Sequence, residues 1–498
     1  MSRDEVAGVV FPASADGRRS TSAVGRAVAA DALRQVDPAG AVAAEHDTDW
    51  RTGYLVHFRR LVEAGLASKD AAVSVARGGL ESVHRQMRVV HHGEETGLGS
   101  LLSAPAQRLV ATVTVPGTGE AESELSLPCH GERLRGSALL RRLDMWAEGG
   151  VIEPSCAEAV RTVAAHPQWL RLAGRTVVAL GAGAEVGPVP VLLGWGAQVI
   201  AIDLPGPPIW ERLVDTARRS GGTLVVPVAD DKPGRHQPGG SDQVIAQRAG
   251  LDLLSDVPAI AGWLAAVDGP LVLGNYVYAD GAANVRLAAA ADALTVRLQA
   301  SRGDVALAFL ATPTDVFAVP AEAVTQSARA YATRSPASKL AGGTLRTLSG
   351  GRLLRRAYTP GADPGINDSL VRQQGPNYAL AKRMHRWRAT LARDSGATVS
   401  MNLAPPSRTR SVVKNRALAA AYAGAYRFGV EVFEPATCKV LMAALLVHDL
   451  HTGGGPAHAH PWQDEAHQAA HGGLWRIAYA PRSALALAAA LGYATARK

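Results

Sequence analysis

Two kinds of hydrophobic pattern divide this chain near residue 171. From about residue 23 to that point, apolar residues recur at spacings of three and four, as in YLVHFRRLVEAGL and DAAVSVARGGLESVHRQM. This spacing places them on one face of a helix and predicts amphipathic helices. The stretch RLVATVTVPGTGEAESELSLPCHG alternates and breaks at Gly and Pro, which predicts a hairpin. We therefore expect residues 1–170 to form an α-rich accessory domain.

After residue 171, short and continuous apolar runs alternate with helical stretches. Such runs, bounded by turn residues, are typical of strands that are buried on both faces of a parallel sheet. The predicted strands are 175–180, 197–205, 222–228, 269–276, 304–312 and 396–404, with a further candidate at 473–480. Strands that alternate with helices predict an α/β fold with a doubly wound parallel sheet. We expect this domain to span residues 171–480.

The first of these strands leads into a glycine-rich turn, in VVALGAGAEVGPVPVLLGWGAQVIAID. Gly181, Gly183 and Gly187 allow the sharp bend and the close backbone approach that a pyrophosphate-binding turn requires. The free amides at the start of the following helix would face the phosphates. Asp203 follows Gly181 by 22 residues, near the spacing of an acid that bonds ribose hydroxyls. This pattern predicts a dinucleotide site, the alternative being a tight turn that binds no nucleotide.

A tyrosine and a lysine stand four residues apart in NYALAK, within a predicted helix. Residues at this spacing share one helix face, so Tyr378 and Lys382 can address one site. With 10 tyrosines and seven lysines in 498 residues, random placement would give well under one such pair. A nearby ammonium favours a phenolate and lowers the pKa of the phenol. The pair could therefore exchange a proton with a substrate, unless it is a coincidental surface pair.

Taken together, these features resemble the short-chain dehydrogenase/reductase family. The order of elements is the same: the glycine turn, Asp203, a strand that ends near Asn275, the strand ALAFLAT, the Tyr378-x-x-x-Lys382 pair and a final strand with a Pro-rich turn. The resemblance covers about 171–480 and implies a Rossmann sheet that binds NAD or NADP. It also implies that Tyr378 is the acid/base, that Lys382 holds the cofactor ribose and lowers the tyrosine pKa, and that Asn275 lies by the cofactor.

The sequence departs from the family pattern at the catalytic hydroxyl. The family serine ends the fifth strand, where this chain has LATPTDVF, so Thr312 or Thr314 would replace it. An insertion at about 318–371 then precedes the tyrosine, and its GINDSLVRQQ segment supplies Ser369 as a second candidate. The residues after Asp203 are Leu-Pro-Gly, without an arginine to pair a 2′-phosphate. We therefore expect NAD(H), with NADP(H) as the alternative.

Composition narrows the class of protein further. The chain is 47% hydrophobic and 19% charged, as is ordinary for globular proteins, and its net charge of +8 is dispersed. Without nucleic-acid motifs, this charge favours anionic small molecules over nucleic acid as partners. Three distant cysteines predict no disulfide framework and fit a reducing compartment. With no signal-peptide pattern and no spanning apolar run, we expect a cytoplasmic protein without stable membrane insertion.

The C-terminal part, residues 448–498, is expected to form a His-rich lid over the substrate pocket and a final helix. Six histidines lie between 448 and 471, in HDLHTGGGPAHAHPWQDEAHQAAHGG. Such spacings can bind zinc or nickel, but the segment lacks Cys and is rich in Gly and Pro, so we expect no metal site.

The sequence therefore predicts an oxidoreductase that interconverts a carbonyl and an alcohol on a small-molecule substrate. Two alternatives remain open at this stage. One is an epimerase or dehydratase of the same family, and the other is a non-catalytic nucleotide-binding regulatory protein. The accessory region would cap the site or mediate association into a homo-oligomer.

Overall fold

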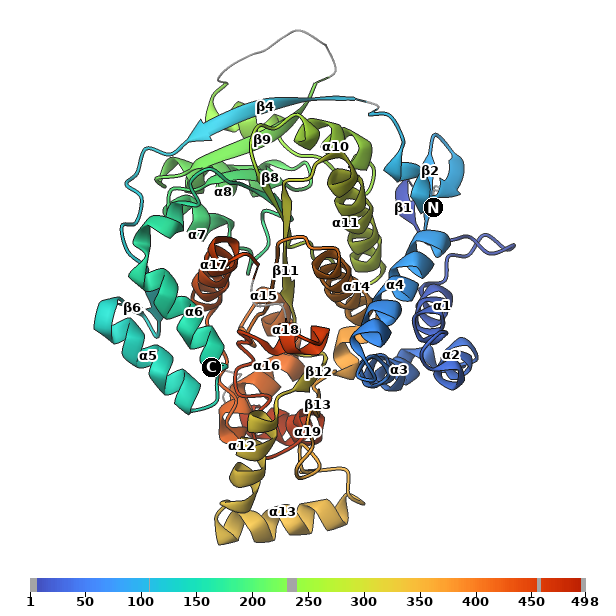
Figure 1. Cartoon of the computed structure of the whole chain (residues 1–498), viewed down its shortest axis with the longest axis vertical. Helices are drawn as coiled ribbons and strands as arrows, with labels where there is room; N and C mark the ends of the chain where they lie inside the picture. The colour runs from blue at the N-terminus through green and yellow to red at the C-terminus, as the bar shows by residue number, and fades with distance from the viewer. Residues whose placement is uncertain (1–6, 107, 231–239, 455–457, 494–498) are drawn as a thin grey trace.

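A seven-stranded sheet forms the centre of the computed structural model, which describes residues 7–106, 108–230, 240–454 and 458–493 (Figure 1). The strands, in their order across the sheet, are β14 (Val399–Leu403), β11 (Val305–Ala311), β10 (Leu271–Asn275), β7 (Thr176–Leu180), β8 (Gln198–Ile202), β9 (Thr223–Asp230) and β4 (Leu109–Pro116). All neighbours are parallel except β4, which pairs antiparallel with β9.

The order of the parallel strands identifies the fold. When the strands are counted along the chain from β7, their order across the sheet is 6-5-4-1-2-3, which is the order of the doubly wound Rossmann fold. The direction of winding reverses between β7 and β10, so a crevice opens at the carboxyl ends of these two strands. The predicted α/β fold class with a doubly wound parallel sheet is confirmed, and this crevice is the expected ligand position.

Helices cover both faces of the sheet because the strands are apolar on both sides. One face packs against α10 (Val257–Ala265), α11 (Ala282–Ser301) and α14 (Gly375–Asp394). The other face packs against α7 (Val189–Gly194), α8 (Pro207–Arg218) and α17 (Pro435–Thr452). In Figure 1 the two groups stand on either side of β11. Buried Val178 and Leu180 face the first group, and Val177 and Ala179 face the second, as strand alternation requires.

The first 170 residues contribute to both sides of this sheet. Three helices contact α14: α1 (Thr21–Leu33), α3 (Trp50–Gly65) and α4 (Lys69–Gln86). A fourth helix, α2 (Pro38–Glu45), packs against α1 and α3. Beside them is a small antiparallel sheet of β1 (Gly8–Val10), β2 (Arg88–His91) and β3 (Glu94–Gly97). The helices α5 (Gly136–Glu148) and α6 (Pro154–Ala165) lie on the opposite side, where α6 packs against α17. Residues 1–6 lie outside the described part of the chain.

Two predictions about strand pairing are wrong. The stretch from 108 to 131 does not form one hairpin, because β4 pairs with β9 while β5 (Leu127–Cys129) pairs with β6 (Glu132–Leu134). The alternation of apolar and polar residues identifies a strand but not its partner. The open edge of β9 has unpaired backbone N–H and C=O groups, and β4 forms hydrogen bonds with them. The candidate strand at 473–480 is a series of turns, because Gly472 and Gly473 have φ values of 63° and 92° that break an extended backbone.

The insertion between β11 and α14 projects from the body, at the bottom of Figure 1. It consists of the antiparallel pair β12 (Val316–Val319) and β13 (Gly365–Asp368), which encloses α12 (Ala321–Ala332) and α13 (Pro336–Leu348). The remaining helices are α9 (Asp242–Arg248), α15 (Arg410–Lys414), α16 (Arg416–Gly424), α18 (Pro461–Ala466) and α19 (Pro481–Gly492). Across the described ranges, every helix is too short or too polar to cross a bilayer.

Candidate functional site

The glycine turn lies directly after β7 and against the end of β10. Gly181 has a φ of 75°, and a Cβ added there would lie 3.0 Å from the backbone oxygen of Tyr276. The Gly181 amide donates to the Ile202 oxygen at 2.8 Å, which ties the turn to the end of β8. Only glycine combines this backbone conformation with so close an approach. The helix α7 begins at Val189, after Gly187, so all three predicted glycines belong to the turn.

Asp203 lies against the second glycine of the turn. Its Oδ2 accepts a hydrogen bond from the Gly183 amide at 2.7 Å, and its Oδ1 accepts one from the Leu204 amide at 2.8 Å. A Cβ on Gly183 would lie 3.1 Å from both Asp203 Oδ2 and Arg212 Nη2. The predicted acid and the predicted turn are therefore neighbours, and each carboxylate oxygen keeps a lone pair for a further donor.

Three cations that the sequence analysis missed surround the turn. Arg212 of α8 directs Nη2 toward the Gly183 oxygen at 3.5 Å. The backbone amide of Arg410 donates to the Glu185 carboxylate at 2.9 Å, and its guanidinium lies 3.5 Å from the same oxygen. Lys439 of α17 interacts electrostatically with Glu185, Arg410 and Arg212, and burial lowers its pKa. Two carboxylates, Asp203 and Glu185, face these three cations, so the turn has a net positive surrounding that suits an anion.

The segment that follows β10 connects the two halves of the site. Asn275, which ends β10 beside Leu180 of β7, is buried, and its Oδ1 accepts from the Val277 amide at 3.4 Å. Asn275 therefore shapes the turn at the crevice. Three residues after Asn275, the Tyr278 ring meets the Tyr378 ring edge-on, with centroids 6.2 Å apart. The glycine turn and the helix with the tyrosine thus contact the same short segment.

Tyr378 and Thr312 lie together at the end of β11. Their hydroxyls form a hydrogen bond, and burial raises the pKa of Tyr378 above its ordinary value of 10. Thr312 Oγ1 lies 3.0 Å from Thr314 Oγ1, and the Gln374 amide donates to the Thr314 hydroxyl. Of the hydroxyls considered from sequence, Thr312 is the one that the structure brings to the tyrosine.

Ser369, the second hydroxyl considered, is held elsewhere. It is buried after β13, where its hydroxyl donates to the Asn367 oxygen at 2.6 Å. The Asn367 amide in turn donates to the Tyr358 hydroxyl at 3.1 Å, so this hydroxyl is part of the internal network of the insertion.

Lys382 points toward the sheet from one turn further along α14. Its Nζ donates to the Leu310 oxygen of β11 at 3.4 Å, and burial lowers its pKa to about 8. Burial, and not Lys382, dominates the pKa of Tyr378. The expectation that the lysine lowers the tyrosine pKa is therefore wrong for this arrangement, because the desolvation of the phenol outweighs any attraction between the two groups.

A buried ion network fixes α14 to the turn that carries Thr312. Asp315 is 1% exposed, and its two oxygens accept from Arg383 Nη2 at 2.6 Å and from Arg386 Nη1 at 2.7 Å. Arg386 also pairs with Glu465 of α18 at 2.6 Å. Both arginines are almost fully buried in the described structure, so these pairs specify the geometry between the Thr312 turn and the helix of Tyr378.

The histidine-rich segment packs against distant parts of the chain. His460 Nε2 lies 3.1 Å from the Gly65 oxygen, and buried His471 Nε2 lies 2.9 Å from Glu153 Oε1. His471 and Arg476 lower the Glu153 pKa to about 2, against the effect of burial. In the described ranges no three His, Cys, Asp or Glu side chains are placed to hold a metal. Residues 455–457 and 494–498 of the predicted lid and final helix lie outside these ranges.

Comparison with known proteins yields little similarity. No protein-family profile and no curated protein matches the chain. Among solved structures, the chain is similar to a thiolation-reductase di-domain from an archaeal non-ribosomal peptide synthetase, with 11% identity and a TM-score of 0.26. The match covers 54% of this chain and 52% of that structure, so the chain spans about half of it. So low a TM-score supports no argument, and the fold assignment depends on the strand order alone.

Proposed function

We propose that this chain is an NAD(H)-dependent oxidoreductase, a divergent relative of the short-chain dehydrogenase/reductases, which reduces a carbonyl on a small molecule. One observation carries the proposal. At the carboxyl edge of a doubly wound sheet, the glycine turn with Asp203 lies on one side of the switch point, and the hydrogen-bonded Thr312 and Tyr378 lie on the other. Ligands of such sheets bind across this point.

The residues around the turn are compatible with a dinucleotide. The turn exposes backbone to the pyrophosphate, and Arg212, Arg410 and Lys439 would balance its charge. Asp203 would accept hydrogen bonds from the ribose hydroxyls and repel a 2′-phosphate, which favours NAD(H). Arg212 is the group near Asp203 that would favour NADP(H), so its substitution tests the choice.

The protonation state of Tyr378 favours reduction. When bound, the cofactor supplies the hydride that adds to the carbonyl carbon. A phenol whose pKa is raised is protonated at neutral pH, so Tyr378 can donate its proton to the carbonyl oxygen and complete the alcohol. Thr312 would then donate a hydrogen bond to the phenolate that remains. With a pKa of about 8, Lys382 is mainly charged at neutral pH, and its ammonium would hold the ribose of the cofactor.

Cofactor binding and turnover test the proposal. Fluorescence titration of the purified chain should show tighter binding of NADH than of NADPH, and Arg212→Gln should weaken the binding of both cofactors by a similar factor, because both carry the pyrophosphate. Arg219→Gln, at the exposed end of the same helix, makes the matched charge change away from the turn. Tighter NADPH binding that Arg212→Gln but not Arg219→Gln abolishes would assign NADP(H) instead.

Retained small molecules, identified by mass spectrometry, would then supply substrates. A net change in nicotinamide absorbance with a carbonyl substrate supports a reductase, whereas conversion without net change supports an epimerase or dehydratase. If neither nicotinamide cofactor binds, the proposal is wrong.

A further inference from the structure

The insertion carries a run of positive charge without any acid. From residue 323 to residue 362 the sequence contains seven basic residues and no Asp or Glu. The basic residues are Arg329, Arg334, Lys339, Arg346, Arg352, Arg355 and Arg356. This segment accounts for most of the net charge of +8. The interpretation of the charge as dispersed is therefore wrong for this segment, because most of the excess positive charge lies in the projecting insertion (Figure 1).

Three of these arginines gather around one tyrosine of α12. The Arg334 and Arg356 guanidiniums lie 3.5 and 4.7 Å from the centroid of the Tyr331 ring. Arg346 Nη1 lies 3.4 Å from the Tyr331 hydroxyl, and Arg334 Nη1 donates to the Tyr479 hydroxyl at 2.8 Å. Tyrosines are thus the side chains that these arginines contact, and in the described structure none of the three forms an ion pair with a carboxylate.

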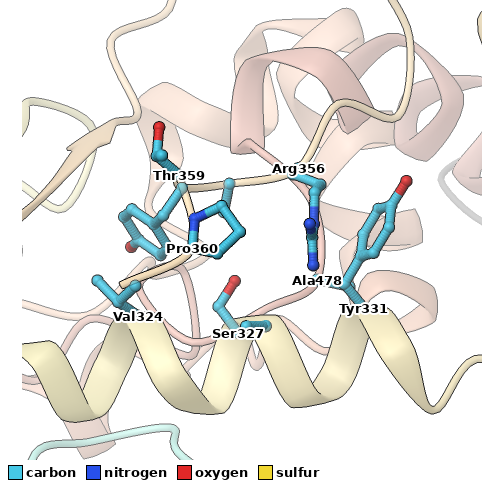
Figure 2. A pocket seen from close by; sticks show the side chains of 10 residues that line it. Val324, Ser327, Tyr331, Arg356, Thr359, Pro360 and Ala478 are labelled. Carbon is cyan, nitrogen blue, oxygen red and sulfur yellow. The ribbon is translucent and has the colours of Figure 1, made fainter. Parts of the chain in front are cut away.

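A depression opens beside this cluster, between α12 and the segment that follows Arg356 (Figure 2). Figure 2 shows Ser327 and Tyr331 rising from the helix toward Arg356 and Pro360. Thr359 and Ala478 also line this space. The depression measures about 190 Å³ with its open mouth included. The depression is shallow and open to solvent, so a single terminal group would lie at its mouth.

Like charges this close require compensation. An exposed cation–π contact contributes only about 0.5–1 kcal/mol, which does not neutralise the mutual repulsion of three guanidiniums. Guanidiniums present forked N–H donors that match the oxygens of an oxyanion. A phosphate monoester carries about −1.5 to −2 charges at neutral pH, closer than a carboxylate to the charge of the three arginines.

We propose that this depression, formed by Arg356, Tyr331 and their neighbouring arginines, is a binding site for a terminal phosphate group, free or carried by a larger molecule. Arg356, which is exposed and lines the depression, contacts the phosphate directly. Arg334 and Arg346, which also contact Tyr331, add positive potential. The site is separate from the nicotinamide site proposed above and does not depend on it.

Calorimetric titration of the full chain with inorganic phosphate tests the site. Acetate serves as a carboxylate for comparison, and glycerol phosphate serves as a phosphate monoester. Phosphate should bind saturably and more tightly than acetate. Arg356→Gln should weaken phosphate binding about tenfold or more, because a charge-assisted hydrogen bond is lost. Lys339→Gln, in the same basic run but outside the depression, should bind as the wild type does. Tighter binding of glycerol phosphate than of free phosphate would identify a carried group.

Three results would overturn the proposal: no saturable binding, equal binding of acetate, or equal losses in Arg356→Gln and Lys339→Gln. Phosphate could also bind at the glycine turn. Phosphate binding that is unchanged in Arg356→Gln would indicate binding at the turn, and it would also count against the site in the insertion. Arg346→Gln serves as a second variant, because Arg346 is exposed and its replacement leaves the fold intact. NADH affinity should be unchanged in both variants, which separates this test from the test of the proposed oxidoreductase.

Discussion

Replacing Tyr378 by Phe removes one hydroxyl from the proposed site and leaves the ring in place. The ring retains its edge-on contact with Tyr278, at a centroid distance of 6.2 Å. The hydroxyl of Thr312 loses one partner but keeps Thr314 Oγ1 at 3.0 Å, so no buried group is left without a hydrogen bond. The expected loss of folding stability is therefore that of one neutral hydrogen bond, about 0.5–1.5 kcal/mol.

The effect on turnover should be much larger than the effect on stability. A positioned proton donor contributes about 10²–10⁴ in rate, which corresponds to about 3–5 kcal/mol of transition-state stabilisation. If Tyr378 donates the proton, kcat should fall by this factor, and the affinity for NADH should stay within about threefold. The loss in kcat should exceed what the loss of stability could cause through unfolding, because a folded protein at 25 °C tolerates 1 kcal/mol.

Tyr278→Phe is the matched control for this experiment. Tyr278 is 49% exposed, touches the same ring, and donates its hydroxyl to Asp280 Oδ1 at 2.9 Å rather than to the site. The control should keep wild-type kcat within about threefold. Steady-state kinetics with a substrate found by mass spectrometry, together with thermal melts, measure both effects. Wild-type turnover in Tyr378→Phe, or an equal loss in both variants, would refute the assignment of Tyr378 as the acid.

Three further predictions concern α14 and its surroundings. Asp315→Asn should lower the free energy of unfolding by about 3–5 kcal/mol in urea denaturation, because buried Arg383 loses its counter-charge. The control is Asp304→Asn, which removes the partly exposed ion pair with Arg302 and should lower this free energy by less than about 1 kcal/mol. Burial holds the pKa of His385 well below 6.5, so as the pH falls the unfolded chain binds a proton at this residue before the folded chain does. Between pH 7 and pH 5.5, the free energy of unfolding of the wild type should therefore fall by about 1 kcal/mol relative to that of His385→Phe. Parallel pH dependences of the two free energies would contradict this prediction. Lys382→Met should weaken NADH binding in fluorescence titration and should also lower the turnover rate. Unchanged NADH binding would show that Lys382 does not contact the cofactor.

Local patterns in the sequence were sufficient to predict the six parallel strands of the central sheet, but not the antiparallel edge strand β4. Apolar runs such as 175–180 and 304–312 report strands buried on both faces, because the residues of each strand alternate between two helix-covered sides. The glycine turn and Asp203 were also predictable, since the turn conformation restricts the residue type and the intervening helix and strand set the spacing. The same local reasoning failed at 473–480, where glycines with positive φ interrupt an apolar run.

Only the tertiary structure decided which distant residues meet. Thr312 and Tyr378 adjoin because the insertion folds outward as its own β12–β13 pair and returns the chain to the end of β11. Arg212 and Lys439 reach the glycine turn from α8 and α17, and no sequence spacing relates them. The periodicity of a segment reflects the geometry of its own backbone, whereas contacts between segments depend on how buried faces pack. The sequence therefore determined the elements and the turn, and packing determined the hydroxyl beside the tyrosine and the charges around the turn.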